Sequence, residues 1–358
     1  MTVAFGVDSF VGVHPVLLVV LACRLDRLVG DPRWCLHPVV VMGWWISQLR
    51  AVAERWAGRR PRRLRLAGGL ITLLLVGGSG LAGWLLERLL LAPVWPPLPG
   101  LVALLVLLIA MASAVAGRSL EQAVRAVLQP LAAGDLALAR QRLSWIVGRD
   151  TADLAPAEIL RAAAETASEN AVDGLFAPLF WMLAGAVLWL ICGGIAAPGP
   201  LALVWAFKAA STLDSMLGYR RGRLRWLGTA GARLDDLLVW LPCRLVALTL
   251  PLAAGCGFPG CWSLFQRARR DGRFDPSPNA GLSQASYAWV VGVQLGGLNR
   301  YGQMSRRKPL LAAGCPAPDA SAVERMLKLS HRLELLWLIT GVAVVTIAPL
   351  LRARFVAQ

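Results

Sequence analysis

Three dense clusters of polar residues interrupt an otherwise apolar stretch between Leu160 and Leu241. The clusters span residues 165–174, 208–215 and 232–236. A charged side chain at bilayer depth costs at least about 3 kcal/mol, so such groups usually face a water-filled cavity, a ligand or the interface. We therefore expect the chemistry of the protein to lie in these clusters.

The first cluster carries three carboxylates, Glu165, Glu169 and Asp173, at intervals of four residues, which places them on one face of a helix. Carboxylates at that spacing destabilise a helix by about 0.2–0.5 kcal/mol, so a cation or a basic partner is implied. Magnesium prefers oxygen ligands and bridges carboxylates to substrate phosphates. We predict that the three residues bind a metal and that Glu169 and Asp173 are also catalytic. The alternative is a solvated helix end paired with Arg161 or another nearby arginine.

The second cluster contains Lys208, one of only three lysines among 37 basic residues. On a helix its side chain shares a face with Ser211, Thr212 and Ser215, and an ammonium with three hydroxyls suits phosphate oxygens. We predict a catalytic role for Lys208. The alternative is a lysine that reaches to the interface, with hydroxyls that bond back to the helix. Asp214 points away from this face, where it would serve the neighbouring carboxylates.

The third cluster ends in Asp235 and Asp236, which follow a basic run and begin an apolar helix. Adjacent aspartates suit a metal–phosphate site, and we predict that both bind metal. Favourable electrostatics at a helix N-terminus would equally explain them.

Weaker polar segments lie at residues 26–32, at His37-Pro38 and at residues 275–281, and Gly296-Gly297 would allow close backbone approach. The chain has no P-loop, no dinucleotide-binding glycine pattern and no H-E-x-x-H motif, so a nucleotide site would be unconventional. The residues that we predict to bind substrate or nucleotide are Asp26, Asp31, His37, Ser168, Asn170, Thr212, Asp214, Ser215, Ser277 and Asn279.

The composition of the whole chain indicates an integral membrane protein. Of its 358 residues 57% are hydrophobic and only 16% are charged, and the mean hydropathy is +0.58. A bilayer span needs roughly 20 apolar residues. The segments that approach this length are 66–91, 98–116, 174–197, 237–258 and 333–351, with a shorter one at 10–23. Alternation typical of strands does not persist. We predict one all-α, polytopic membrane domain over residues 1–358, with about five to seven spans or re-entrant helices.

The net charge of +16 comes from arginines placed between apolar segments, as the positive-inside rule expects. Because no aromatic-rich surface accompanies them, nucleic acid is not an expected partner. The loop between the first two spans, which carries Arg50, Arg55 and the arginines of residues 59–65, is assigned to the cytoplasm. Residues 118–170 mix both charge signs and predict a cytoplasmic helical subdomain, broken near Pro130 and Gly134, with Asp135 as an N-cap. A return between residues 199 and 217 requires a broken or re-entrant helix. We therefore predict a multi-pass inner-membrane protein with its active site on the cytoplasmic side.

Taken together, these segments resemble the adenosylcobinamide-phosphate synthase family of cobalamin biosynthesis over nearly the whole chain. The motifs that carry the resemblance are residues 26–32 with 37–38 and 42–43, residues 165–174 with 177–180, residues 208–214 with 218–220, residues 232–236, and residues 277–281 with 296–297. The resemblance implies a protein of the lipid bilayer that catalyses an ATP-dependent amide ligation, which joins (R)-1-amino-2-propanol, or its O-phosphate, to a propionate carboxylate of adenosylcobyric acid. It implies ATP, Mg²⁺ and a corrinoid as ligands, and other membrane enzymes of late cobalamin synthesis as possible partners.

The predicted site residues suit such a ligation. ATP would convert the carboxylate into an acyl phosphate that the amine attacks. The acidic residues would hold metal or take the proton of the amine, and Lys208 would stabilise phosphoryl charge.

One position departs from the family pattern. After residue 281 the pattern continues Trp-Pro-Glu, whereas this chain has Leu282-Ser283-Gln284 and so lacks a carboxylate. This departure keeps open a non-enzymatic signalling paralog of the β-lactamase regulation type. A transporter whose broken helices bind an anion is a third class.

Overall fold

The computed structural model describes residues 14–30, 37–91, 100–192, 194–301 and 304–356. The chain divides into two compact units. The first comprises residues 1–116, 178–238 and 338–358, and the second comprises residues 117–177 and 239–337. Each unit is described by itself.

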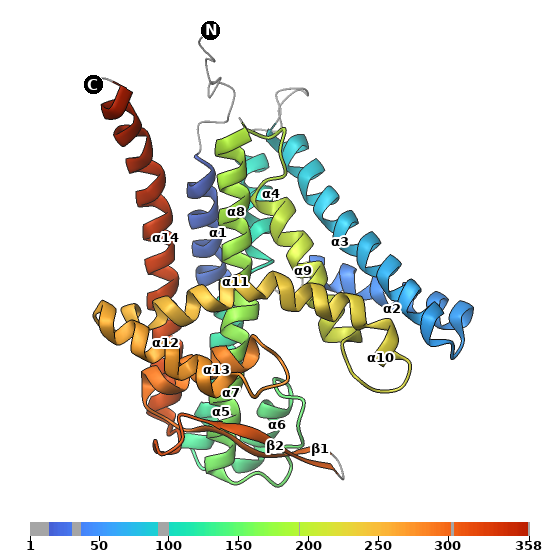
Figure 1. Ribbon diagram of the computed structural model, residues 1–358, viewed down its shortest axis with the longest axis vertical. Helices are drawn as coiled ribbons and strands as arrows, with labels where there is room; N and C mark the ends of the chain where they lie inside the picture. The colour runs from blue at the N-terminus through green and yellow to red at the C-terminus, as the bar shows by residue number, and fades with distance from the viewer. Residues whose placement is uncertain (1–13, 31–36, 92–99, 193, 302–303, 357–358) are drawn as a thin grey trace. The chain divides into compact units, whose positions relative to one another are not determined.

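The first unit is built from helices (Figure 1). They are α1 (Pro15–Val29), α2 (Pro38–Ala57), α3 (Pro61–Leu91), α4 (Gly100–Ala112), α8 (Ala177–Cys192), α9 (Pro200–Leu217), α10 (Leu224–Leu227), the start of α11 (Thr229–Ala253) and the end of α14 (Ala320–Val356). The second unit contains α5 (Gly117–Ala132), α6 (Leu136–Ser144), α7 (Pro156–Ala171), the π-helix η1 (Val172–Phe176), α12 (Phe258–Gly272), α13 (Ala280–Val291), and strands β1 (Leu295–Tyr301) and β2 (Met304–Leu311), together with the remainder of α11 and α14.

The all-helical membrane class is confirmed. In the described residues three helices are long and apolar enough to cross a membrane, at Pro61–Leu91, Pro156–Cys192 and Thr229–Ala253. A fourth is added if α4 and α5, which meet at 47°, form one bent span. This count is below the predicted five to seven. At the N-terminus, α1 has only 15 residues, fewer than the roughly 20 that a span needs, and part of the predicted segment 10–23 lies outside the described residues.

In the first unit α9 lies against α3, and the contact depends on glycine and on one buried carboxylate. A Cβ atom on Gly83 would lie 2.8 Å from Cα of Ala202, so only glycine permits this approach. The fully buried Glu87 accepts hydrogen bonds from the backbone N–H groups of Gly199 (2.9 Å) and Leu201 (2.6 Å) at the start of α9. Such a carboxylate satisfies N–H groups that the helix itself leaves unpaired. In place of the predicted broken or re-entrant helix, α9 is one uninterrupted helix of 18 residues.

The predicted helical subdomain falls within the second unit, which also includes residues 239–337. Helices α5, α6 and α7 share a small apolar core that includes Val127, Leu143 and Ile159. The Asp135 carboxylate accepts from the Leu138 N–H at 2.9 Å, which confirms the predicted N-cap. Helix α5 ends at Ala132, close to the predicted break.

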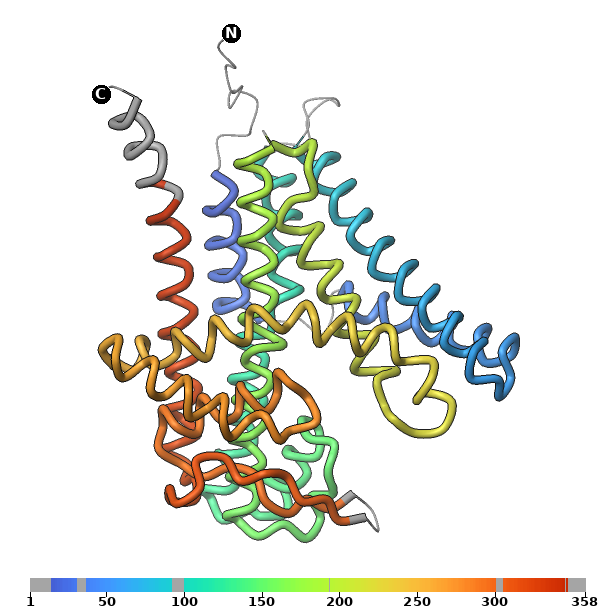
Figure 2. The backbone as a smooth tube through the Cα atoms, in the orientation of Figure 1, coloured from blue at the N-terminus to red at the C-terminus, as the bar shows by residue number. Residues whose placement is uncertain are grey.

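The second unit contains a β-hairpin that was not predicted from the sequence. Strands β1 and β2 pair antiparallel, with Gly297 opposite Lys308 and a bulge between Leu295 and Gly297. Figure 2 shows the two strands running side by side. Gly296 has φ +86°, and a Cβ atom there would lie 1.9 Å from the carbonyl oxygen of Pro309. The predicted close approach at Gly296-Gly297 is therefore confirmed.

Candidate functional site

Helix α7 presents two of the predicted carboxylates to the hairpin and to α13. It begins at a proline, and the Glu158 carboxylate accepts from the Ala155 N–H at 3.1 Å, which closes its first turn. After α7 the chain makes the π-helical turn η1, which contains Asp173. Single π-helical turns inserted in α-helices occur frequently at functional sites.

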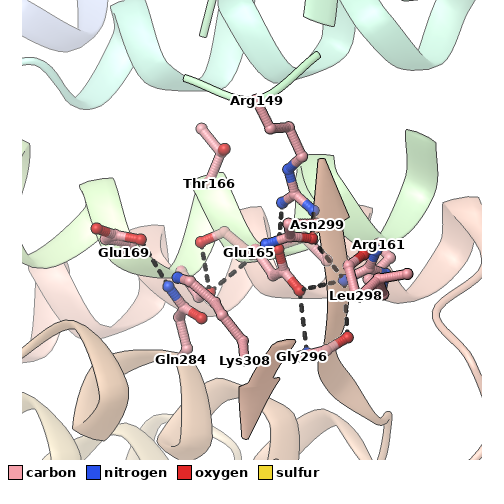
Figure 3. A network of polar contacts seen from close by, with 12 residues as sticks. Arg149, Arg161, Glu165, Thr166, Glu169, Gln284, Gly296, Leu298, Asn299 and Lys308 are labelled. Atoms are coloured by element: carbon pink, nitrogen blue, oxygen red, sulfur yellow. Dashed lines mark hydrogen bonds and ion pairs between the residues drawn. The ribbon is translucent and has the colours of Figure 1, made fainter. Parts of the chain in front are cut away.

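Glu165 is the centre of a closed ion-pair network (Figure 3). Its carboxylate pairs with the guanidinium groups of Arg149 and Arg161, the latter at 3.1 Å, and accepts from the Gly296 N–H at 3.0 Å. Both arginines also donate to Oδ1 of the buried Asn299. The Glu165 side chain is only 3% exposed, and each of its oxygens has a partner. Glu165 therefore joins α7 to the hairpin.

Arg161 of α7 bonds to the backbone of β1 at its bulge. Its guanidinium donates to the carbonyl oxygens of Gly296 (2.7 Å) and Leu298 (2.9 Å) in addition to Glu165. The irregular backbone at Gly296 turns one N–H toward the carboxylate and one carbonyl toward the arginine. The strand and α7 are thus joined by charge-assisted hydrogen bonds, which are about twice as strong as neutral ones.

Glu169, one helical turn beyond Glu165, has a different environment. Its Oε2 accepts from Nε2 of Gln284 at 2.6 Å, and Gln284 is fully buried in α13. The neighbouring Ser283 hydroxyl donates to the carbonyl of Ser168, so two adjacent residues of α13 hold this turn of α7. Within the described residues Gln284 is the only hydrogen-bond partner of the Glu169 carboxylate. Gln284, at the position where the resemblance leads us to expect a carboxylate, therefore provides an amide donor to Glu169.

Two cavities meet at Glu169 and Lys308. The larger, of about 680 Å³, lies between the 274–280 loop and β2. The smaller, of about 240 Å³, lies between α7, the 146–149 loop and Asn299. The Lys308 ammonium is 3.8 Å from a carboxylate oxygen of Asp275, and both groups interact electrostatically with Glu169. Arg306 and Arg307 line the larger cavity as well. The shared wall thus brings carboxylates and cations to the same place.

The 275–281 loop sets the start of α13. The Asp275 carboxylate accepts from the Ser277 N–H at 2.9 Å, and the Ser277 hydroxyl accepts from the Ala280 N–H at 3.3 Å. Asn279 is buried, and its Oδ1 accepts from Arg244 at 2.8 Å. Of the two predicted binding residues here, Ser277 lines the larger cavity, whereas the amide oxygen of Asn279 is engaged with Arg244.

In the first unit the structure brings the second and third clusters together. Asp235 on α11 interacts electrostatically with Asp214 and Lys208 of α9 and with the adjacent Asp236. Among the described residues Oδ1 of Asp235 is a buried oxygen without a hydrogen-bond partner. Arg220 faces Asp236 in turn. These four predicted residues therefore form one charged group.

The hydroxyls of α9 follow the alternative interpretation. Thr212 donates to the Lys208 carbonyl at 2.7 Å, and Ser215 donates to the Ser211 carbonyl at 2.9 Å. Each hydroxyl oxygen still has lone pairs that accept hydrogen bonds. Because these two hydroxyls donate back to the helix, neither has a proton left for a phosphate oxygen in this conformation.

The remaining predicted residues are dispersed. Asp26 is buried in α1. The Nδ1 atom of His37 accepts from the Val39 N–H at 3.3 Å and so caps α2. Asp173 interacts electrostatically with Cys243, and Asp31 lies outside the described residues.

The predicted site residues thus fall on both units. The residues that sequence reasoning missed are Arg149, Asn299, Lys308 and the arginines of β2. Lys308 could have been singled out from the sequence by the criterion used for Lys208, because the chain has only three lysines among its 37 basic residues.

Comparison with known proteins places the chain in a family. A family model described as "CobD/Cbib protein" matches residues 19–330. "Cobalamin biosynthesis protein CobD" from Synechocystis sp. is 41% identical over 336 residues, which cover 92% of this chain and 93% of the relative. "Cobalamin biosynthesis protein CobD" from Klebsiella pneumoniae is 39% identical, with 90% and 93% covered. "Cobalamin biosynthesis protein CbiB" from Salmonella typhimurium is 36% identical, with 93% and 96% covered. No solved structure matches the chain significantly. Because both the family model and these relatives extend over most of its length, the chain belongs to the CobD/Cbib protein family.

Proposed function

We propose that this protein works in cobalamin biosynthesis, where it joins (R)-1-amino-2-propanol or its O-phosphate to a propionate carboxylate of adenosylcobyric acid with consumption of ATP. The biosynthetic role is supported by the names of relatives that are 36–41% identical over nearly the whole chain. The ligation chemistry is supported by one observation above all, the cavity wall at which Glu169 and Lys308 face each other in an otherwise apolar chain.

Amide formation from a carboxylate requires activation. Transfer of the terminal phosphoryl group of ATP to the carboxylate gives an acyl phosphate and ADP. The amine then attacks the acyl carbon, and phosphate leaves. Cations must stabilise the phosphoryl oxygens, and a base must take the proton of the amine. Lys308 with Arg306 and Arg307 is suited to the first task, and Glu169 to the second.

Magnesium belongs to this proposal as the ion that accompanies ATP. In the described residues no group of three or more His, Cys, Asp or Glu side chains is arranged to hold a metal. Such an ion commonly uses only one or two protein carboxylates and takes its other ligands from phosphates and water. Glu169 with Asp275 in the second unit, or Asp214 with Asp235 in the first, fits that donor requirement. Glu165 fits it less well, because arginines and a backbone N–H already occupy both of its oxygens.

The charged group around Lys208 is a second candidate for phosphoryl recognition. The two candidate lysines, Lys208 and Lys308, can be separated by substitution because the third lysine provides a matched control. Lys328 is exposed on α14 and lines neither cavity. We place the reaction on the cytoplasmic face of the inner membrane, where ATP is available.

The proposed step is tested by feeding a deletion strain. Cells that lack this gene should grow when given cobinamide but not when given cobyric acid, because only cobinamide lies beyond the block. The wild-type gene should restore growth on cobyric acid, and so should Lys328→Ala. Growth of the deletion strain on cobyric acid would refute the assignment.

A further inference from the structure

We infer that the smaller cavity, between α7, the 146–149 loop and Asn299, binds a small amino alcohol or its phosphate ester, with the ammonium group against Glu169. This inference rests on the proposed ligation and names the place of one of its substrates.

The volume of the smaller cavity restricts its ligand to a small molecule. Its volume of about 240 Å³ lies below the roughly 300–1,000 Å³ of pockets that enclose drug-sized ligands. A corrin ring or a nucleotide does not fit in it, whereas a three-carbon amino alcohol does. The larger cavity of about 680 Å³ remains for part of a bulky, phosphate-bearing reactant.

The lining of the smaller cavity matches both ends of such a molecule. Asn170, Asn299 and Thr166 contribute amide and hydroxyl groups, and Lys308 contributes a cation. These groups suit a hydroxyl or a phosphate ester. At the same wall Glu169 offers Oε1, because in the described residues only Gln284 bonds to this carboxylate and it does so at Oε2. A carboxylate oxygen in this position suits an ammonium.

The residues that both cavities share place the amine next to the second reactant. Glu169 and Lys308 line both cavities, so a nitrogen held against Glu169 stands at the boundary with the larger cavity. Glu169 takes one proton from the ammonium and frees its lone pair. The nitrogen then forms the C–N bond with the acyl carbon, the bond from that carbon to the phosphate oxygen breaks, and phosphate leaves with the electron pair. The second proton on nitrogen that is lost passes to solvent.

Two substitutions test the cavity without touching its charges. Asn170→Leu removes the amide of an exposed residue, and Thr166→Val removes a hydroxyl whose hydrogen bond to the Ile146 carbonyl is long, at 3.5 Å. Each should raise KM for the amino alcohol at least tenfold, with KM for ATP and the unfolding temperature unchanged. Leu310→Ala, which alters only the larger cavity, should leave KM for the amino alcohol unchanged.

Binding of (R)-1-amino-2-propanol and of its O-phosphate is also measured calorimetrically in lipid nanodiscs without ATP or corrinoid. The compound whose affinity falls at least tenfold in Asn170→Leu is the ligand of the cavity. Binding that depends on Asn170, in a protein that forms no amide, would refute the ligation and keep the cavity assignment. Amide formation with an unchanged amine KM in both folded variants would refute the cavity assignment and keep the ligation. Absence of both binding and amide formation would refute both.

Discussion

Glu165 and Glu169 lie one helical turn apart on α7, yet their environments are opposite. Glu165 also lines the smaller cavity, but two arginines and a backbone N–H already bond to its two carboxylate oxygens. Glu169 has one amide donor and forms part of the wall between two cavities. Sequence spacing makes the two carboxylates equivalent. Their partners make the first a structural group and leave the second available for chemistry.

The largest effect on stability is expected for Glu165→Gln. This change removes the charge that pairs with Arg149 and Arg161, and loss of one partner of a buried ion pair costs about 3–5 kcal/mol. Thermal unfolding in detergent should show the loss. The control is Glu158→Gln on the same helix, an exposed carboxylate that should cost about 1 kcal/mol or less. A stable Glu165→Gln protein with an increased magnesium requirement would favour the metal role predicted from spacing.

The charged group of the first unit is tested by Lys208→Ala. If this ammonium stabilises phosphoryl charge, product formation should fall at least about 100-fold while membrane insertion is unaffected. Arginine should rescue poorly, because a planar guanidinium does not replace a compact ammonium. Product assays compare the variant with Lys328→Ala and with Lys308→Ala. Full activity of Lys208→Ala would leave Lys308 as the remaining lysine candidate.

The hairpin joint is tested by Gly296→Ala. An added Cβ atom would meet the Pro309 carbonyl at 1.9 Å in a backbone conformation with φ +86°, and such strain costs about 1–3 kcal/mol. Gly292→Ala is the matched control, because Gly292 has φ +76° but a Cβ atom there would meet nothing within 4 Å. Its loss should be about 1 kcal/mol. Equal unfolding temperatures for the two variants would show that the close approach does not matter.

How far the sequence predicts this structure depends on the range of the interactions. The cap at Asp135 was predictable because local backbone geometry determines it, and the glycine pair at residues 296–297 marked a close approach without indicating its partner, Pro309. The grouping of Lys208 with Asp235 was not predicted, because the two residues lie on different helices and no local pattern relates them. The pairing of Arg149 with Asn299 was not predictable, since 150 residues separate them and no local pattern marks either one.

The hairpin was missed for a related reason. Residues 295–311 contain two adjacent glycines and a run of basic residues, and they lack the alternation that signals a half-buried strand. The extended conformation of β1 is stabilised by tertiary contacts, chiefly those of Arg161 with the carbonyls of Gly296 and Leu298.

A smaller effect is expected for Gln284→Glu, which introduces the carboxylate that the resemblance leads us to expect at this position. The new carboxylate would face Glu169 at about the 2.6 Å that now separates the amide from it, so one of the two groups must take up a proton or a cation. Product formation at neutral pH should fall by roughly tenfold, equivalent to about 1.4 kcal/mol. The control is Gln294→Glu, which lies outside both cavities. An increase in activity would show that the second carboxylate assists Glu169.

The central claim is that the ligation takes place at the cavity wall that contains Glu169, with Glu169 as the base. Glu169→Gln tests this claim most directly. Purified protein in lipid is given ATP, magnesium, the amino alcohol and the corrinoid carboxylate, and the amide is quantified by mass spectrometry. Wild-type protein should form amide and consume ATP only when both co-substrates are present. Glu169→Gln should form at least about 100-fold less amide, while its unfolding temperature stays near that of the wild type. Amide formation at the wild-type rate by the folded variant would contradict the claim.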